Sequence, residues 1–74
     1  MKNILDMNKT IYELCKENSR LKERLKSIGF ENIADDKMLN TVGRIMTIPK
    51  GAKIKGYDIN EVKEKLIKEG YHIV

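Results

Sequence analysis

The sequence has 74 residues, of which 35% are charged and only 5% aromatic, and its formal net charge is +4. A chain this short buries only about 60% of the surface that it exposes when unfolded, which predicts one small domain over residues 1–74 with an aliphatic core. Its one cysteine excludes an internal disulfide, and no apolar run approaches the roughly 18 residues of a membrane span. With no signal-peptide hydrophobic region near residue 1, we expect a cytoplasmic protein without membrane contact.

The first third of the chain predicts an extended segment followed by two short helices. Residues 4–7 are mostly apolar and are expected to lie extended against the core. Thr10 and Glu13 have the spacing of a capping box, which opens a helix that ends near residue 17. The Asn-Ser pair at 18–19 is expected to break this helix and to cap a second one over about 20–28. The side chains that these helices should bury are Ile11, Leu14, Cys15, Leu21, Leu25 and Ile28.

Two helices of the chain are predicted to end in the same way. Residues 25–30 and 66–71 each place a leucine four residues before a glycine, which an aromatic residue follows. Gly29 and Gly70 therefore lie where a residue with a left-handed backbone conformation commonly ends a helix, and the aromatic residue that follows can pack on the helix end. Shared capping physics explains this similarity without a sequence repeat.

The middle of the chain predicts a central helix with one apolar face. Residues 31–36 form a loop that Ile33 anchors, and Asp35 or Asp36 caps the helix that follows. On a 3.6-residue period, an arc of about 120° holds the apolar side chains of this helix, with Arg44 pointing away. Pro49 should halt it, because its ring disfavours α geometry at the residue before. The apolar residues of the arc are Met38, Leu39, Val42, Ile45 and Met46.

After Pro49 the sequence predicts a turn, a last helix and an extended end. Residues 50–56 read as a basic turn bracketed by glycines, in which alternation of apolar residues and lysines allows a short edge strand. Asp58 and Glu61 form a second capping box, which opens a helix that should bury Ile59, Val62, Leu66 and part of Ile67. Residues 71–74 should lie extended beside 52–55 or 4–7. The predicted fold class is all-α: a compact bundle of about four short helices with small extended segments at the N-terminus, after Pro49 and at the C-terminus.

The sequence lacks the side chains that catalysis and metal binding need. Cys15 and His72 are the only cysteine and histidine, and one of each cannot build a zinc or iron–sulfur site in a monomer. Cys15 lies on the apolar side of its helix and is expected to be buried and inert, whereas His72 is expected to be exposed. Asp35 and Asp36 fit a helix cap better than a catalytic carboxylate pair. We therefore expect no enzyme activity, no cofactor, no metal and no small-molecule substrate.

The central stretch and the basic turn carry the two functions that the residues favour. The first is a non-catalytic interaction or sensory module, which contacts a partner protein or a second copy of itself through region 38–51. Its predicted surface comprises Met38, Thr41, Val42, Gly43, Arg44, Met46, Thr47, Pro49 and Lys50. The second is weak nucleic-acid binding through a basic patch of Arg44, Lys50, Lys53 and Lys55. Two features oppose nucleic-acid binding. Asp58 occupies a helix N-cap that a phosphate would use, and Tyr57 is the only aromatic side chain near the basic patch in the sequence.

Gly43 bears on the first of these functions. It lies at the edge of the apolar arc, where the missing Cβ lets another backbone approach closely. The neighbour is either a helix of the same chain or a second molecule, and the first is the more ordinary reading.

Several blocks of the sequence resemble a bacterial family named domain of unknown function 1858. They are Thr10–Leu14, Leu21, Leu25 and Gly29-Phe30, then Met38–Arg44 and Met46–Gly51. The resemblance implies a small helical domain that occurs alone or ahead of PAS-like and hemerythrin-like modules. The first half is also similar to the N-terminal domain of di-iron proteins that repair iron–sulfur clusters, and to a redox-disulfide domain associated with hybrid-cluster proteins. Those relatives carry cysteines after the glycine, where this chain has Glu31, Asn32 and Ile33, so only docking to iron or redox proteins would carry over.

Overall fold

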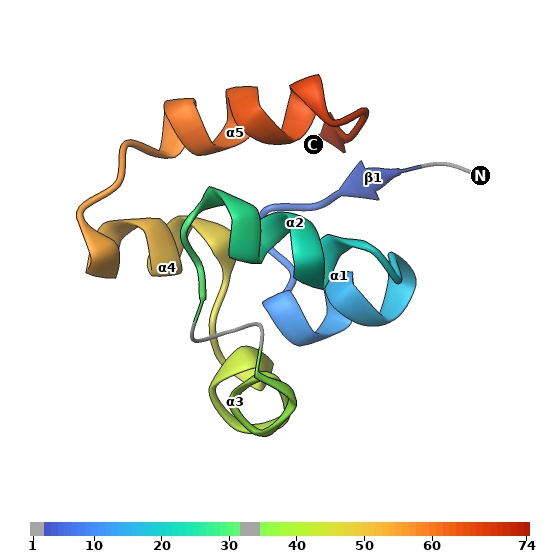
Figure 1. Ribbon diagram of the computed structural model, residues 1–74, viewed down its shortest axis with the longest axis vertical. Helices are drawn as coiled ribbons and strands as arrows, with labels where there is room; N and C mark the ends of the chain where they lie inside the picture. The colour runs from blue at the N-terminus through green and yellow to red at the C-terminus, as the bar shows by residue number, and fades with distance from the viewer. Residues whose placement is uncertain (1–2, 32–34) are drawn as a thin grey trace.

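The computed structural model describes residues 3–31 and 35–74, and in these residues five short α-helices surround a small core (Figure 1). The elements in chain order are β1 (Ile4–Leu5), α1 (Ile11–Glu17), α2 (Leu21–Ile28), α3 (Asp36–Thr41), the 3₁₀ helix η2 (Val42–Arg44), α4 (Ile48–Lys55), α5 (Ile59–Lys68) and β2 (His72–Ile73). The prediction of a small, mostly helical domain is confirmed. The predicted Ile33 anchor lies outside the described residues.

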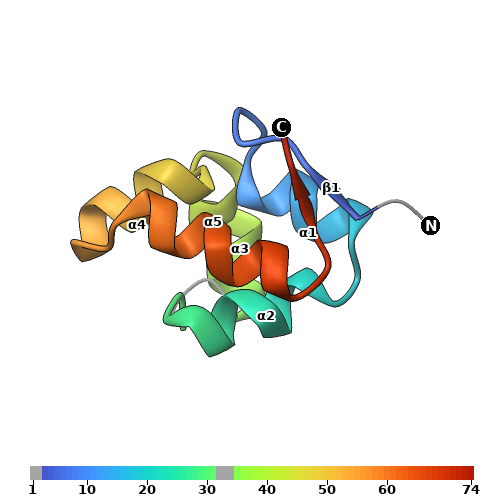
Figure 2. The ribbon, with the colours of Figure 1, turned by 90° about the horizontal axis from the view of Figure 1, so that it is seen from above.

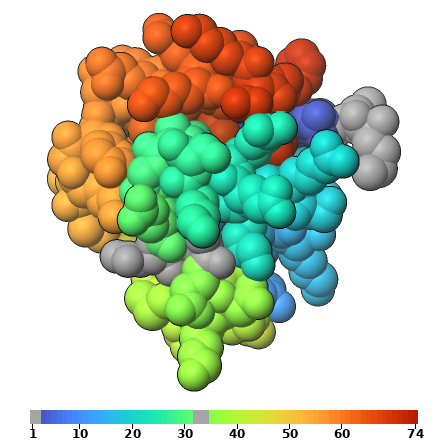
Figure 3. Space-filling model, viewed as in Figure 1, coloured from blue at the N-terminus to red at the C-terminus, as the bar shows by residue number. Residues whose placement is uncertain are grey.

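Helix α5 crosses the top of the molecule in Figure 1. It contacts α4 along one side and α2 below, and α4 and α5 lie next to each other in the view from above (Figure 2). Helix α1 packs against α2 and η2. Helix α3 lies below the other helices and is seen end-on in Figure 1. In the space-filling view α3 forms the lower end of the molecule (Figure 3), where it remains in contact with α1.

The two ends of the described chain are joined by a two-stranded parallel sheet. Ile4 pairs with His72 and Leu5 with Ile73. The His72 amide donates to the Asn3 carbonyl at 2.7 Å, and the Val74 amide donates to the Leu5 carbonyl at 2.9 Å. Residues 71–74 therefore lie beside the N-terminal segment, which is the second of the two predicted alternatives.

The core is aliphatic with one phenylalanine and one tyrosine, as the composition requires. Every helix contributes to it except α3, which buries no residue. The buried apolar residues are Leu5, Ile11, Leu14, Leu21, Leu25, Phe30, Ile48, Ala52, Val62, Leu66 and Tyr71. Ile67, which was expected to be partly buried, is 54% exposed.

The prediction that Pro49 halts a helix is wrong. Thr47 caps the N-terminus of α4 with its hydroxyl, and Pro49 is the second residue of that helix. A proline is tolerated there, because the amide that it lacks would have no partner in the first turn and its fixed φ suits a helix. Residues 48–55 are consequently helical, and the predicted basic turn and edge strand do not form. Gly56 ends the helix with a φ of +74°.

The central helix is shorter than predicted, and its apolar face is only partly buried. Helix α3 ends at Thr41 and continues as the single 3₁₀ turn η2. The Thr41 hydroxyl donates to the Lys37 carbonyl at 2.8 Å, and the Asn40 amide group donates to the Asp36 carbonyl at 2.9 Å. Such side-chain bonds compete with the helix ladder, and Gly43 weakens it further.

The other predicted helix ends are largely confirmed. Thr10 and Glu13 form the capping box, Asp35 caps α3, and Gly29 and Gly70 have φ values of +117° and +98°. The aromatic residues after both glycines are buried. Asp58 caps α5, but its carboxylate accepts from the Asn60 amide rather than from Glu61. The residue pair 18–19 does not cap α2, whose N-cap is Arg20 without a side-chain bond.

Candidate interaction surface

The structure divides the predicted interaction surface between solvent and interior. Met38, Thr41, Arg44 and Lys50 are exposed. Gly43 is buried, and the remaining predicted members are half-buried: Val42, Met46, Thr47 and Pro49. The nine residues therefore do not form one continuous exposed face.

Three of these residues have roles within the fold. A Cβ at Gly43 would lie 3.0 Å from Leu39 Cδ1, so the glycine accommodates a side chain of its own helix. The carbonyl of Met46 accepts a 2.7 Å bond from the Ile11 amide, which ties the segment before α4 to the start of α1. Thr47 pairs with Thr10 as an isolated antiparallel bridge and caps α4. The close neighbour of Gly43 is thus the Leu39 side chain four residues earlier, whereas the sequence predicted the backbone of another helix or of a second molecule.

Arg44 of η2 contacts Tyr12 of α1. Its guanidinium carbon lies 4.4 Å from the centroid of the Tyr12 ring, and its Nε donates to the Asn40 carbonyl at 2.8 Å. A guanidinium over an aromatic face is attracted by the negative potential of the ring. The contact joins η2 to α1, and the Arg44 side chain is nevertheless exposed.

Helix α4 presents two opposite faces. Ile48, Gly51 and Ala52 are buried against the body. Lys50, Lys53 and Ile54 are three and four residues apart, the spacing of one helix face, and all three are exposed. Lys55 follows at the C-terminal end. We call Lys50, Lys53 and Ile54 the α4 face.

The segment from residue 37 to residue 57 contains five basic residues and no acidic one. Helices α1, α2, α3 and α5 each carry an acidic residue in the first turn, whereas α4 carries none. The ion pairs of the described residues all involve other lysines and arginines, and none reaches Lys50, Lys53 or Lys55. The alternation of charges along the rest of the sequence does not extend to this acid-free segment (residues 37–57).

The acid-free segment also holds the most exposed large apolar side chains of the described chain. Ile45 is 73% exposed and Ile54 is 72% exposed. Ile45 was expected to be buried in the apolar arc, together with Met38, which is 37% exposed. Reading residues 48–55 as a helix would have placed Ile54 opposite the buried side chains. Because the sequence predicts that Pro49 ends a helix, it does not single out Ile54 as an exposed contact.

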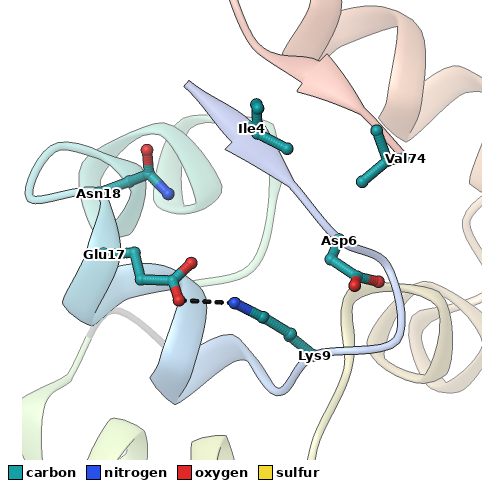
Figure 4. A pocket seen from close by; sticks show the side chains of 6 residues that line it. All are labelled: Ile4, Asp6, Lys9, Glu17, Asn18 and Val74. Carbon is teal, nitrogen blue, oxygen red and sulfur yellow. Dashed lines mark hydrogen bonds and ion pairs between the residues drawn. The ribbon is translucent and has the colours of Figure 1, made fainter. Parts of the chain in front are cut away.

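A separate open cavity of about 290 Å³ lies between β1, the end of β2 and α1 (Figure 4). Its wall contains Ile4, Asp6, Lys9, Glu17, Asn18 and Val74. Lys9 Nζ and a Glu17 carboxylate oxygen are 2.7 Å apart across the opening, and this bond raises the pKa of Lys9. Lys9 and Glu17 thus neutralise each other, and the wall offers no nucleophile beside a free base.

The cysteine and the histidine lie on different elements and differ in exposure. Cys15 is half-buried on α1, and burial raises the pKa of its thiol to about 11. His72 is exposed on β2. In the part of the chain that the structure describes, no three side chains of the ligating types gather around one point. No helix there is long and apolar enough to cross a bilayer.

Comparison with known proteins places the chain in a family. The model of a family described as a domain of unknown function (DUF1858) matches residues 5–63. A crystal structure of a conserved domain protein from Streptococcus pneumoniae TIGR4 is similar over the whole chain and over 94% of that protein, with 30% identity and a TM-score of 0.93. No curated protein matches. The chain therefore belongs to the DUF1858 family.

Proposed function

We propose that this domain is a non-catalytic interaction module, which binds another protein through the acid-free segment. The observation that carries the proposal is the exposure of Ile45 and Ile54. Of the seven large apolar side chains that are exposed in the described residues, four lie in this segment: Met38, Ile45, Ile54 and Tyr57. Along this segment exposed apolar side chains alternate with basic ones. Where such side chains form one patch, another protein typically covers it.

The side chains of the segment favour binding over catalysis. It contains lysines, aliphatic residues and hydroxyls, but no cysteine, histidine or carboxylate. Its two threonines are engaged, since the Thr41 hydroxyl donates to a backbone carbonyl and the Thr47 hydroxyl accepts from the Lys50 amide. An activated nucleophile needs an adjacent base, and none is near these hydroxyls in sequence.

Nucleic-acid binding is less well supported by the same segment. Its one guanidinium lies over Tyr12, and its one aromatic residue is also engaged. The Tyr57 hydroxyl donates to the Gly29 carbonyl at 3.3 Å, and its ring packs edge-on against Phe30. Base stacking would need a free aromatic face.

Site-specific photo-cross-linking in the organism that carries the gene tests the proposal. A benzophenone amino acid is placed at position 45 or 54, and a control is placed at Ile67, which is also exposed but lies on α5. We expect a discrete protein adduct from position 45 or 54 and none from position 67. Adducts of equal yield from all three positions, no adduct at all, or adducts that contain only nucleic acid would contradict it.

A further inference from the structure

We infer that the α4 face binds an acidic segment of the partner protein, with Ile54 as its apolar contact. This inference rests on the proposed function and specifies the chemistry of the partner. It follows from the charge of α4, from the exposure of Ile54 and from the way in which the body of the domain holds the helix.

The positive charge of the α4 face has no counterpart within the described chain. Lys53 and Lys55 stand in the last turn of α4, where a cation is favoured by the helix dipole. Lys50 stands in the first turn, where the same dipole opposes a cation, and no carboxylate compensates it. The fold therefore gives no electrostatic reason for Lys50, whereas an acidic partner would supply one.

Ile54 distinguishes an acidic protein segment from other polyanions. Ile54 is four positions after Lys50 and directly follows Lys53, so an aliphatic side chain lies among the lysines. A phosphate backbone gains nothing from covering it, whereas a peptide with alternating acidic and apolar residues can neutralise the lysines and bury the isoleucine together. An eight-residue helix with one exposed aliphatic residue is also too small to anchor the domain to a membrane surface.

The α4 face is held in a fixed position before any partner binds. The helix is capped at both ends, by Thr47 and by Gly56. On its inner side Gly51 lies against Phe30, because a Cβ there would be 3.0 Å from Phe30 Cε1. A rigid surface loses little conformational entropy on binding, which favours affinity for a short segment.

The test is a titration of the isotope-labelled domain, followed by amide chemical shifts. The probe is a 14-residue peptide of alternating glutamates and leucines, and two control peptides replace either all glutamates by glutamine or all leucines by serine. We expect the probe to shift the amides of residues 48–56 at low salt and the effect to fade as salt rises, because exposed charges are screened. Each control peptide should bind more weakly.

Matched substitutions locate the site. The double variant Lys50→Gln with Lys53→Gln should weaken binding about fivefold, since each exposed ion pair contributes modestly. Lys65→Gln with Lys68→Gln removes two lysines of the same spacing from α5, beside Glu64 and Glu69, and should leave affinity within about twofold. Ile54→Ser should weaken binding, and Ile67→Ser should not. All six substituted positions are exposed, and circular dichroism confirms that each variant is folded.

Four results of the titrations would overturn the inference. They are an equal loss in the α5 variants, shifts that map away from α4, tighter binding of a duplex DNA or of anionic vesicles at the same salt, and no binding of the acidic probe. A protein adduct from position 45 or 54 whose cross-linked segment is not acidic would overturn the inference and leave the proposed function in place. The absence of any protein adduct would instead reject the proposed function.

Discussion

Gly51 gives the sharpest test of how α4 is seated on the core. A Cβ there would lie 3.0 Å from Phe30 Cε1, 3.5 Å from Phe30 Cδ1 and 3.8 Å from Met46 Cγ. The ring has little room to withdraw, because Phe30 is only 1% exposed and meets the Tyr57 ring edge-on at a centroid distance of 5.7 Å. We therefore predict that Gly51→Val destabilises the domain.

The expected size of the effect follows from two opposing contributions. Helix propensity favours valine over glycine by a few tenths of a kcal/mol. Overpacking a core typically costs about 1–3 kcal/mol. The net loss should be about 2 kcal/mol, which for a domain of this size lowers Tm by roughly 8–16 °C.

Thermal and urea unfolding, followed by circular dichroism at 222 nm, measure this loss. Lys53→Val on the exposed side of the same helix is the control and should change stability by less than about 0.5 kcal/mol. Phe30→Leu should partly rescue Gly51→Val, with a coupling energy of about 1 kcal/mol in the double-mutant cycle. A Gly51→Val variant as stable as the parent protein would refute the close contact between Gly51 of α4 and the Phe30 ring.

Two further predictions concern α1. Thr10→Ala removes the capping hydroxyl and should cost about 1 kcal/mol at pH 7 in urea unfolding. The Thr10 amide and hydroxyl both donate to the Glu13 carboxylate and lower its pKa below 4.5. The stabilisation from these bonds is therefore present above pH 4.5 and is lost as pH falls through the lowered pKa. The difference in unfolding free energy between Thr10→Ala and the parent protein should narrow over the same range. Burial raises the pKa of the Cys15 thiol to about 11. At pH 7.5 iodoacetamide should therefore alkylate Cys15 at least about tenfold more slowly in the folded domain than in the urea-unfolded chain. Equal alkylation rates would contradict this prediction.

The helix ends that depend on local chemistry could be predicted from the sequence. Gly29 and Gly70 adopt left-handed backbone conformations because few other residues tolerate them, and the spacing of leucine, glycine and aromatic residue reveals both. The capping box of Thr10 and Glu13 is likewise a contact between residues three apart. Such features need no knowledge of the tertiary structure.

The features that were mispredicted depend on context. Pro49 is equally consistent with the end of one helix and the first turn of another, and only Thr47 two residues earlier indicates the second. The contact of Arg44 with Tyr12 joins residues 32 positions apart, so no local pattern in the sequence reveals it. The candidate interaction surface is therefore the acid-free segment with its α4 face, and not a continuous surface over 38–51.

The cross-linking yield from position 54 in two charge backgrounds tests whether the α4 lysines hold the partner protein. With Lys50→Gln and Lys53→Gln, we predict that the protein adduct from position 54 falls to a small fraction of its yield in the parent chain. With Lys65→Gln and Lys68→Gln, the yield should stay the same. An adduct that survives loss of the α4 lysines, or that is lost equally in both backgrounds, would contradict the account.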